Sequence, residues 1–149
     1  MNKILVINGP NLNMLGKRDP KHYGTLTLEH IEQLLVEEAK VLNLSIDCYQ
    51  SNIEGELINK IHSALVYEGV IINAGAYTHY SYAIADALSL LDIPIVEVHL
   101  SHIHNRESFR EKSVLAKCCV GQITGFKEYS YTLALHALDK ILKNNGGII

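Results

Sequence analysis

The sequence predicts an α/β fold in which one parallel, five-stranded sheet lies between two layers of helices. Three observations support this prediction. Along the chain of 149 residues, short apolar runs alternate with segments that repeat apolar residues at helical spacing. The apolar runs are typical of strands buried on both faces, as in a parallel sheet. No shift of composition, internal repeat or low-complexity stretch divides the chain, so residues 1–149 are expected to form a single domain.

The first half of the chain is expected to hold two strands and two helices. Lys-Ile-Leu-Val-Ile at residues 3–7 predicts the first strand, which ends at the turn sequence Asn-Gly-Pro. A polar loop then extends to about Gly24, and Thr27 is a suitable N-cap for a helix. The apolar face of that helix contains Leu28, Ile31, Leu34, Leu35, Ala39 and Leu42. Residues 44–49 alternate as in a strand near the sheet edge, and residues 56–66 have helical spacing, with Leu57, Ile58, Ile61 and Leu65.

The second half repeats this pattern. Gly-Val-Ile-Ile-Asn at residues 69–73 predicts a buried third strand. A helix is expected from about Ser81 to Leu91, and its apolar side contains Ala83, Ile84, Ala87, Leu88 and Leu91. Two further strands are expected at residues 93–98 and 119–124, and a closing helix at residues 129–142. Asn-Asn-Gly-Gly then ends the regular structure.

Composition argues against several classes of protein. The formal net charge is −3 with acids and bases interspersed, so no basic face for nucleic acid is expected. No apolar run approaches the roughly 18–20 residues that a membrane span needs, and the first run lacks the features of a signal peptide. Cys48, Cys118 and Cys119 have no C-x-x-C spacing. Buried free thiols in a reducing cytoplasm are therefore expected.

The expected strand order places a site at one edge of the sheet. For five such units the common order is 2-1-3-4-5, which gives a flavodoxin-like three-layer sandwich. In this order ligands bind beyond the carboxyl ends of the strands, near the point between strands 1 and 3 where the order reverses. The unusual polar sequence follows strands 1, 3 and 4, at residues 8–20, 73–81 and 99–107. We therefore expect these three segments to meet around a ligand.

Glu97 and His99 form the clearest candidate pair. Alternate residues of a strand share a face, so the two side chains are expected on the same side. A carboxylate inside a buried strand costs several kcal/mol unless it has a partner. A neighbouring carboxylate favours the charged imidazole and fixes its tautomer, which prepares a general acid. The alternative is a Glu97 that turns to solvent at the strand end.

Metal and phosphate sites are weaker interpretations of the same segments. His99, His102 and His104 have a spacing that a metal ion accepts, but no carboxylate or cysteine completes an obvious ligand set. A loop without metal is therefore favoured. Residues 16–18, Gly-Lys-Arg, imitate only the end of a phosphate-binding loop, and Pro10 removes one backbone donor.

The loop after the first strand contains Arg18 and, five residues later, Tyr23. A tyrosine has an ordinary pKa of about 10 and is a poor base at neutral pH, but a nearby guanidinium favours tyrosinate. From the residues alone, a tyrosine packed beneath the loop is the simpler interpretation. The loop is long, with Gly16 and Gly24 near its ends, so it is expected either to act as a lid or to be a plain solvated loop.

Three motifs connect the chain with a known family. The first is Asn-Gly-Pro-Asn-Leu-Asn-Met-Leu-Gly at residues 8–16, followed by Arg18, Pro20 and Tyr23-Gly24. The second is Ile-Asn-Ala-Gly-Ala-Tyr-Thr-His-Tyr-Ser at residues 72–81. The third is Glu-Val-His-Leu-Ser at residues 97–101, followed by Arg106-Glu107 and Phe109-Arg110. In order, spacing and chain length these motifs resemble those of the type II 3-dehydroquinate dehydratases (3-dehydroquinases), over essentially the whole chain.

This resemblance implies a lyase that reversibly removes water from 3-dehydroquinate through an enolate to give 3-dehydroshikimate, in the shikimate pathway. Tyr23 would be the base, and Arg18 would hold it as tyrosinate. Asn11 would hold a water molecule that meets the enolate charge. His99 would protonate the leaving hydroxyl, supported by Glu97. The family has no metal, forms no Schiff base and needs no cofactor, so none is expected here.

The resemblance also implies a set of substrate contacts. Ser101, with the backbone of Leu100 and Ser101 and the help of Asn73, would bind the substrate carboxylate. His79 and Arg110 would hold ring hydroxyls. The family has a flavodoxin-like fold and often forms a homododecamer of trimers, in which Asp86 would reach the site of a neighbouring subunit. The family usually has asparagine at the position of His102 and often leucine at that of Met14.

Two functions of other classes stay open on the residues alone. One is a flavodoxin-like module that binds a nucleotide or flavin without catalysis. The other is a metal-dependent hydrolase that uses His99, His102 and His104. The first predicts a bound chromophore or phosphate at the first loop, and the second predicts activity that a chelator abolishes.

Overall fold

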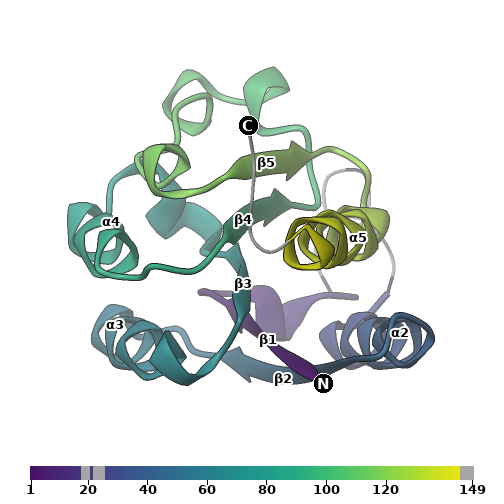
Figure 1. The fold of residues 1–149 in the computed structure, drawn as a ribbon. Helices are drawn as coiled ribbons and strands as arrows, with labels where there is room; N and C mark the ends of the chain where they lie inside the picture. The colour runs from purple at the N-terminus through teal and green to yellow at the C-terminus, as the bar shows by residue number, and fades with distance from the viewer. Residues whose placement is uncertain (18–20, 22–25, 145–149) are drawn as a thin grey trace.

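The chain forms a three-layer α/β sandwich in a computed structural model that describes residues 1–17, 21 and 26–144 (Figure 1). The sheet is parallel and its order is β2-β1-β3-β4-β5, as expected. Its strands are β1 (Asn2–Asn8), β2 (Leu44–Gln50), β3 (Gly69–Asn73), β4 (Ile95–His99) and β5 (Gly121–Thr124). One face is covered by α2 (Leu28–Val41) and α5 (Tyr129–Lys143), and the other by α3 (Glu54–His62) and α4 (Tyr82–Ser89).

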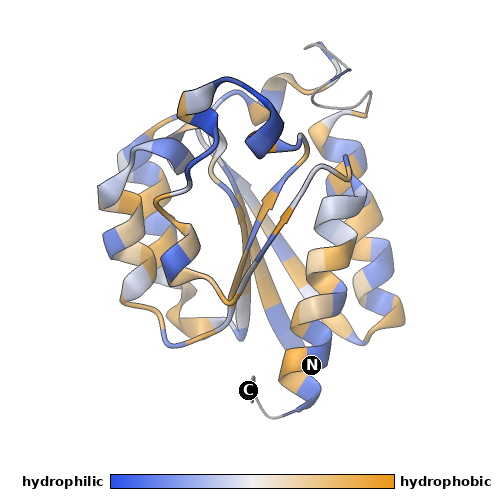
Figure 2. Cartoon of the chain, turned by 90° about the horizontal axis from the view of Figure 1, so that it is seen from above, coloured by the Kyte–Doolittle hydropathy of each residue, from blue (hydrophilic) through white to orange (hydrophobic). Residues whose placement is uncertain are grey.

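Each face of the sheet has its own apolar core. In β1, Ile4 and Val6 pack toward α2 and α5, whereas Leu5 and Ile7 pack toward α3 and α4. Because successive strand residues point to opposite faces, a strand that is apolar throughout needs a helical layer on both sides. Figure 2 shows the sheet between these two layers. This arrangement buries the middle of the sheet and leaves its carboxyl edge as the place for polar groups.

Side-chain caps fix the starts of two helices. The Thr27 hydroxyl oxygen accepts a hydrogen bond from the His30 backbone N–H at 3.3 Å, which confirms the predicted N-cap of α2. The Ser81 hydroxyl accepts from the Ile84 N–H at 3.0 Å and begins α4 in the same way. The second cap connects the polar segment after β3 directly to the helix that follows it.

Some predicted boundaries and faces are wrong. The helix expected at residues 56–66 runs from Glu54 to His62 and then tightens into a 3₁₀ turn, which leaves Leu65 exposed. Leu34 and Ala83, expected on apolar faces, are also exposed. The last strand begins at Gly121, because residues 116–118 form another 3₁₀ turn. His99 belongs to β4 itself rather than following it, and this places the residue at the rim of the sheet.

The cysteines are free thiols, as expected, but they are only partly buried. Burial, together with the nearby Glu32 and Asp47 carboxylates, raises the pKa of the Cys48 thiol to about 12. Such a thiol stays protonated and unreactive near neutral pH. Within the described part of the chain, no helix is both long enough and apolar enough to cross a membrane.

Candidate active site

The three polar segments meet around one cavity of about 100 Å³ at the carboxyl edge of the sheet. This is the edge that the strand order predicted. The lining residues are Pro10, Asn11, Leu12, Asn73, Gly75, Ala76, His79, His99, Leu100, Ser101, Ile103, Arg106 and Arg110. Seven of the predicted site residues are among them: Asn11, Asn73, His79, His99, Leu100, Ser101 and Arg110.

Close backbone contacts hold the first segment against the second. The Gly9 N–H donates to the Asn73 carbonyl at 2.7 Å. A Cβ atom at Gly9 would lie 2.5 Å from the carbonyl oxygen of Ala74, so no side chain fits there. Gly75 has a φ of +59°, and its N–H donates to the Asn73 side-chain oxygen at 3.2 Å. These contacts fix the distance between two walls of the cavity.

A buried polar network orients the Asn73 amide. Its Nδ2 donates to the Tyr131 hydroxyl at 3.0 Å, and that hydroxyl donates to the Asn8 Oδ1 at 2.6 Å. Burial raises the pKa of the fully buried Tyr131 phenol, so it stays protonated and keeps its role as a donor. Each amide nitrogen carries two hydrogens, so Asn73 keeps one donor for the cavity that it lines.

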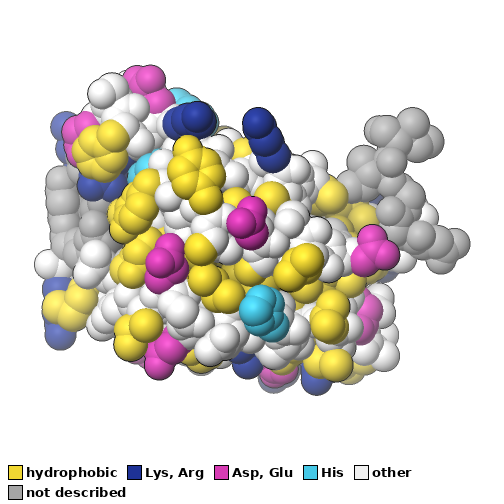
Figure 3. Space-filling model, turned by 90° about the vertical axis from the view of Figure 1, so that its left-hand side faces the viewer, with side chains coloured by type: hydrophobic (Ala, Val, Ile, Leu, Met, Phe, Trp, Pro, Cys, Tyr) yellow, Lys and Arg dark blue, Asp and Glu magenta, His cyan; other side chains and the backbone are white. Residues whose placement is uncertain are grey.

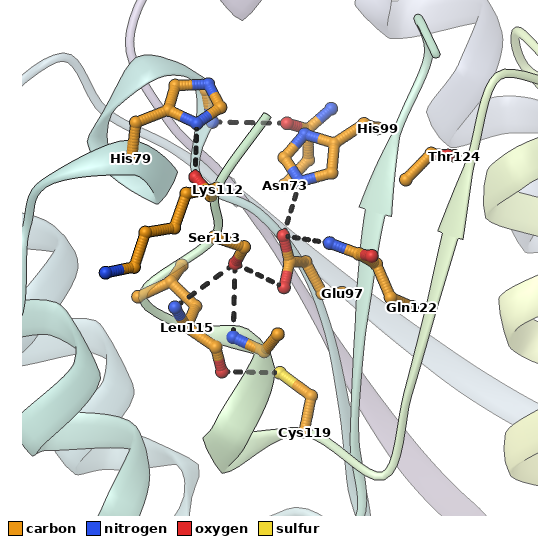
Figure 4. A network of polar contacts seen from close by, with 12 residues as sticks. Asn73, His79, Glu97, His99, Lys112, Ser113, Leu115, Cys119, Gln122 and Thr124 are labelled. Atoms are coloured by element: carbon orange, nitrogen blue, oxygen red, sulfur yellow. Dashed lines mark hydrogen bonds and ion pairs between the residues drawn. The ribbon is translucent and has the colours of Figure 1, made fainter. Parts of the chain in front are cut away.

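Glu97 lies behind His99 in the interior of β4 (Figure 4). The His99 Nε2 lies 2.5 Å from Glu97 Oε2, so the predicted pair is formed. The same carboxylate accepts hydrogen bonds from the Gln122 amide at 3.0 Å and from the Ser113 hydroxyl at 2.8 Å. Because Nε2 is engaged with the carboxylate, Nδ1 is the ring nitrogen of His99 that is available to a bound molecule.

The Glu97 carboxyl is ionised although it is fully buried. Burial, the largest single influence, raises the pKa of this carboxyl. The hydrogen bonds and charge of His99, and the hydrogen bonds from Gln122 and Ser113, lower it and together prevail, so the net pKa lies below the ordinary value. The expected alternative, a Glu97 turned toward solvent, is therefore wrong.

His79 lies on the opposite wall and is held by the backbone. Its Nδ1 lies 2.8 Å from the Lys112 carbonyl oxygen. A carbonyl only accepts, so Nδ1 carries the proton and Nε2 is an acceptor in the neutral ring. Burial, the main influence, lowers the pKa of His79, and the positive charges of His99 and Arg110 add to this effect. His79 is therefore suited to accept a hydrogen bond from a hydroxyl.

The third segment supplies donors and positive charge. Leu100 and Ser101 are buried at the end of β4 and line the cavity. The Arg110 Nε donates to Glu107 at 2.9 Å, which holds the guanidinium at the cavity wall. Arg106 also lines the cavity, with its Nη1 3.5 Å from the Ser101 hydroxyl. Arg106 belongs to the third family motif but was not proposed as a site residue. The sequence signal for it is that all three arginines, Arg18, Arg106 and Arg110, lie within or just after the polar segments.

Of the remaining predicted residues that the structure describes, Asn11 lines the cavity from the first segment, whereas Asp86 does not. Asn11 is exposed and has a left-handed conformation with a φ of 69°, and its N–H donates to the Asn52 side chain. Asp86 is exposed on α4 and is not among the cavity-lining residues. Arg18 and Tyr23 lie outside the described residues.

The histidines of the third segment do not converge on one point. His99 is paired with Glu97, whereas the rings of His102 and His104 contact each other edge to face at 5.9 Å. Throughout residues 1–17, 21 and 26–144, no three histidine, cysteine or acidic side chains gather as metal ligands do. The geometry therefore gives no support to the metal-hydrolase alternative.

Comparison with known proteins agrees with this geometry. The family model described as "Dehydroquinase class II" matches residues 2–139, which include all three segments. The chain belongs to the class II dehydroquinase family. A 3-dehydroquinate dehydratase from Clostridium perfringens is 58% identical to it over 144 residues, which cover 95% of this chain and 99% of the relative. One from Bacillus cytotoxicus is 55% identical over 139 residues, 93% and 95% of the two chains.

Solved dehydroquinase structures have the same fold as this family member. The type II dehydroquinase from Butyrivibrio crossotus superposes with a TM-score of 0.91 at 47% identity and covers 93% of this chain and 97% of its own. That from Propionibacterium acnes has a TM-score of 0.91 at 41% identity and covers 94% and 97%. The family, the fold and the enzyme class expected from the sequence are therefore confirmed.

Proposed function

We propose that this class II dehydroquinase reversibly dehydrates 3-dehydroquinate to 3-dehydroshikimate through an enolate, a step of the shikimate pathway for aromatic amino acids. The observation that carries the proposal is the Glu97–His99 pair, which leaves one imidazole nitrogen for a cavity lined by arginine, serine and amide groups. Such a site suits a small hydroxylated acid that loses water. The curated relatives named 3-dehydroquinate dehydratase support the choice of substrate.

The first step is removal of a proton from the carbon next to the ketone. Tyr23 is the base, and the Arg18 guanidinium holds it as tyrosinate, because a nearby positive charge favours the anionic phenol. The resulting negative charge on the enolate oxygen requires a donor that is already in place. A water molecule held by Asn11 supplies that donor, and the place of Asn11 in the cavity lining supports this role.

The second step expels the hydroxyl group as water. His99 gives a proton to the leaving oxygen, and the enolate electrons form the new carbon–carbon double bond. The Glu97 carboxylate, which is held by three donors, stabilises the charged imidazole before the transfer. The short distance between the two side chains supports a fixed orientation of the ring.

The substrate is oriented by groups on both walls. Its carboxylate binds the Ser101 hydroxyl, the backbone N–H groups of Leu100 and Ser101, and the remaining Asn73 donor. These groups come from the ends of two adjacent strands, which supports convergence on one anion. His79 accepts a hydrogen bond from one ring hydroxyl through Nε2, and Arg110 donates to another. Residues 1–149 then act as a single flavodoxin-like catalytic domain in the cytoplasm, with no cofactor or metal.

We propose a homododecamer built of trimers as the assembly, with Asp86 completing the site of a neighbouring subunit. Figure 3 shows hydrophobic side chains on the face formed by α3 and α4. Tyr80, Tyr82 and Leu90, at the ends of α4, are 59%, 66% and 70% exposed, which is unusual for large side chains and typical of a subunit contact. Asp86 lies on the same helix, on its exposed side.

The subunit role of Asp86 predicts complementation between two inactive variants. Asp86→Ala and His99→Ala should each be nearly inactive when prepared alone. When the two are co-expressed, some sites combine an intact His99 with an intact Asp86 of a neighbour, so activity should return in the mixed assembly. The measurement is the dehydration rate of the purified mixture, with each variant co-expressed with itself as the control. Activity no higher than in the two controls would place Asp86 outside the neighbour's site.

The reaction itself is tested by the ultraviolet absorbance of the conjugated enone product. Wild-type protein incubated with 3-dehydroquinate should generate this absorbance at an unchanged rate in EDTA, because no metal takes part. Borohydride added with substrate should leave the activity intact, because no Schiff base forms. No enone formation would reject the proposed function, and inactivation by borohydride or EDTA would reject the proposed chemistry.

A further inference from the structure

A run of three consecutive residues outside the cavity lining contacts His79, which lines the cavity, and Glu97, which pairs with the lining residue His99. The Lys112 carbonyl accepts the hydrogen bond from His79 Nδ1, and the Ser113 hydroxyl donates to Glu97 Oε1. The Val114 N–H donates to the Thr78 carbonyl at 2.9 Å. We call residues 112–114 the brace. Figure 4 shows the backbone carbonyl of Lys112 next to His79 and the side chain of Ser113 next to Glu97.

The hydrogen bonds around Ser113 leave its hydroxyl only one orientation. The oxygen accepts from the backbone N–H groups of Leu115 and Ala116, each at 3.1 Å. A serine hydroxyl has two lone pairs and one proton, so these two donors occupy both lone pairs. The proton then points to Glu97 Oε1, 2.8 Å away. The turn after the brace thus makes Ser113 an obligate donor to the carboxylate.

The hydrogen bond from Ser113 determines which groups contact the second oxygen of the Glu97 carboxylate. With Oε1 held by Ser113, Oε2 receives the Gln122 amide and faces His99 Nε2. Rotation of the carboxylate would break all three contacts. Because an ionised carboxylate only accepts, His99 must direct its Nε2–H toward Glu97 and keep Nδ1 for the cavity.

We propose that Ser113 is a positioning residue for the acid step, which fixes the Glu97 carboxylate and through it the orientation of the His99 ring. The inference rests on the proposed function, since His99 is the acid there. Ser113 does not line the cavity, so its effect reaches the substrate only through the pair. The neighbouring Lys112 carbonyl sets the tautomer of His79 from the same segment, so the brace orients both imidazoles.

Replacing Ser113 by alanine removes the donor to Glu97 and should lower kcat about tenfold, because hydrogen bonds to charged groups are worth more than neutral ones. KM should change less than twofold, since the groups that bind the substrate keep their own partners. Ser113→Thr keeps the hydroxyl and should restore most of kcat. The measurement is the enone assay over a range of substrate concentrations, with thermal unfolding measured for each variant.

Ser51 provides a matched control. Its hydroxyl also donates to a carboxylate, Glu56 Oε1, and accepts a backbone N–H, that of Ile53 at 3.0 Å. It is buried but lies outside the cavity lining. Ser51→Ala therefore removes the same kinds of hydrogen bond, with one accepted backbone N–H instead of two, and should leave kcat unchanged. An equal loss of kcat in both alanine variants would reduce Ser113 to a structural role and overturn the proposal.

A double substitution tests whether Ser113 acts through Glu97. In a Glu97→Gln background the ionised acceptor is already gone, so adding Ser113→Ala should lower kcat no further. A full additional tenfold loss would mean that Ser113 acts by another route. If the wild type is active and Ser113→Ala retains its kcat, the positioning role is wrong and the proposed function stands. If the wild type forms no enone, the proposed function fails by itself.

Discussion

Replacement of His99 by alanine is expected to lower kcat for dehydration by about 10²–10⁴-fold, the range usual for loss of a general acid. The imidazole lies at the cavity wall with its Nε2 held by Glu97, so no other described side chain has the same position and partner. Without this acid the hydroxyl group must leave as hydroxide. Removal of the proton next to the ketone does not use His99 and should continue.

The separation of the two steps is measured by exchange in deuterated water. In the His99→Ala variant, 3-dehydroquinate should still exchange the proton next to the ketone while enone formation is lost. His136→Ala is a suitable control, because His136 is an exposed histidine whose ring also contacts a carboxylate, Glu38, at 2.8 Å. That variant should behave as the wild type. Loss of exchange together with dehydration in His99→Ala would contradict the assigned order.

Tyr23→Phe is expected to reduce turnover by orders of magnitude and to leave the fold intact. Phenylalanine keeps the ring but has no oxygen to take the proton, so enolate formation has no base. Arg18→Ala should have a similar effect for a different reason. Without the guanidinium the phenol returns toward its ordinary pKa of about 10 and is largely protonated at neutral pH.

These two variants differ from His99→Ala in one observable. Both should lose proton exchange as well as dehydration, because the base acts first. Raising the pH should recover part of the activity of Arg18→Ala, because the Tyr23 phenol then loses its proton without help from a guanidinium. It should recover none of the activity of Tyr23→Phe, which has no phenol. Tyr129→Phe, at an exposed tyrosine at the start of α5, is the control. Turnover like that of the wild type in Tyr23→Phe would exclude this residue as the base.

The fold was predictable because it depends on local patterns. Apolar β-branched runs and helical spacing are properties of short windows, and the rule for strand order follows from their alternation. The errors occurred where tertiary context decides. Leu65 has helical spacing, but the chain tightens after His62, and residues 116–118 turn before β5 begins. Neither change has a marker in the local sequence.

The site was predictable only in part from the residues. Glu97 and His99 share a strand face at a separation of two, so their pairing follows from strand geometry. The other partners of Glu97 are distant in sequence: Ser113 is 16 residues away and Gln122 is 25. No sequence periodicity connects residues at such separations, so the contacts of the brace with Glu97 and His79 could be found only in the three-dimensional structure.

The phenol of Tyr131 packs in the interior beneath α5 and also holds Asn73, which lines the cavity. A substitution on the inner side of α5 that displaces Tyr131 should consequently also change the position of the Asn73 amide in the cavity. Tyr131→Phe keeps the ring but removes the hydroxyl, so it would remove a hydrogen-bond partner from both Asn8 on β1 and Asn73 on β3. We therefore expect natural substitutions at Asn8, Asn73 and Tyr131 to occur together. A substitution at Tyr131 should weaken ligand binding although Tyr131 does not line the cavity.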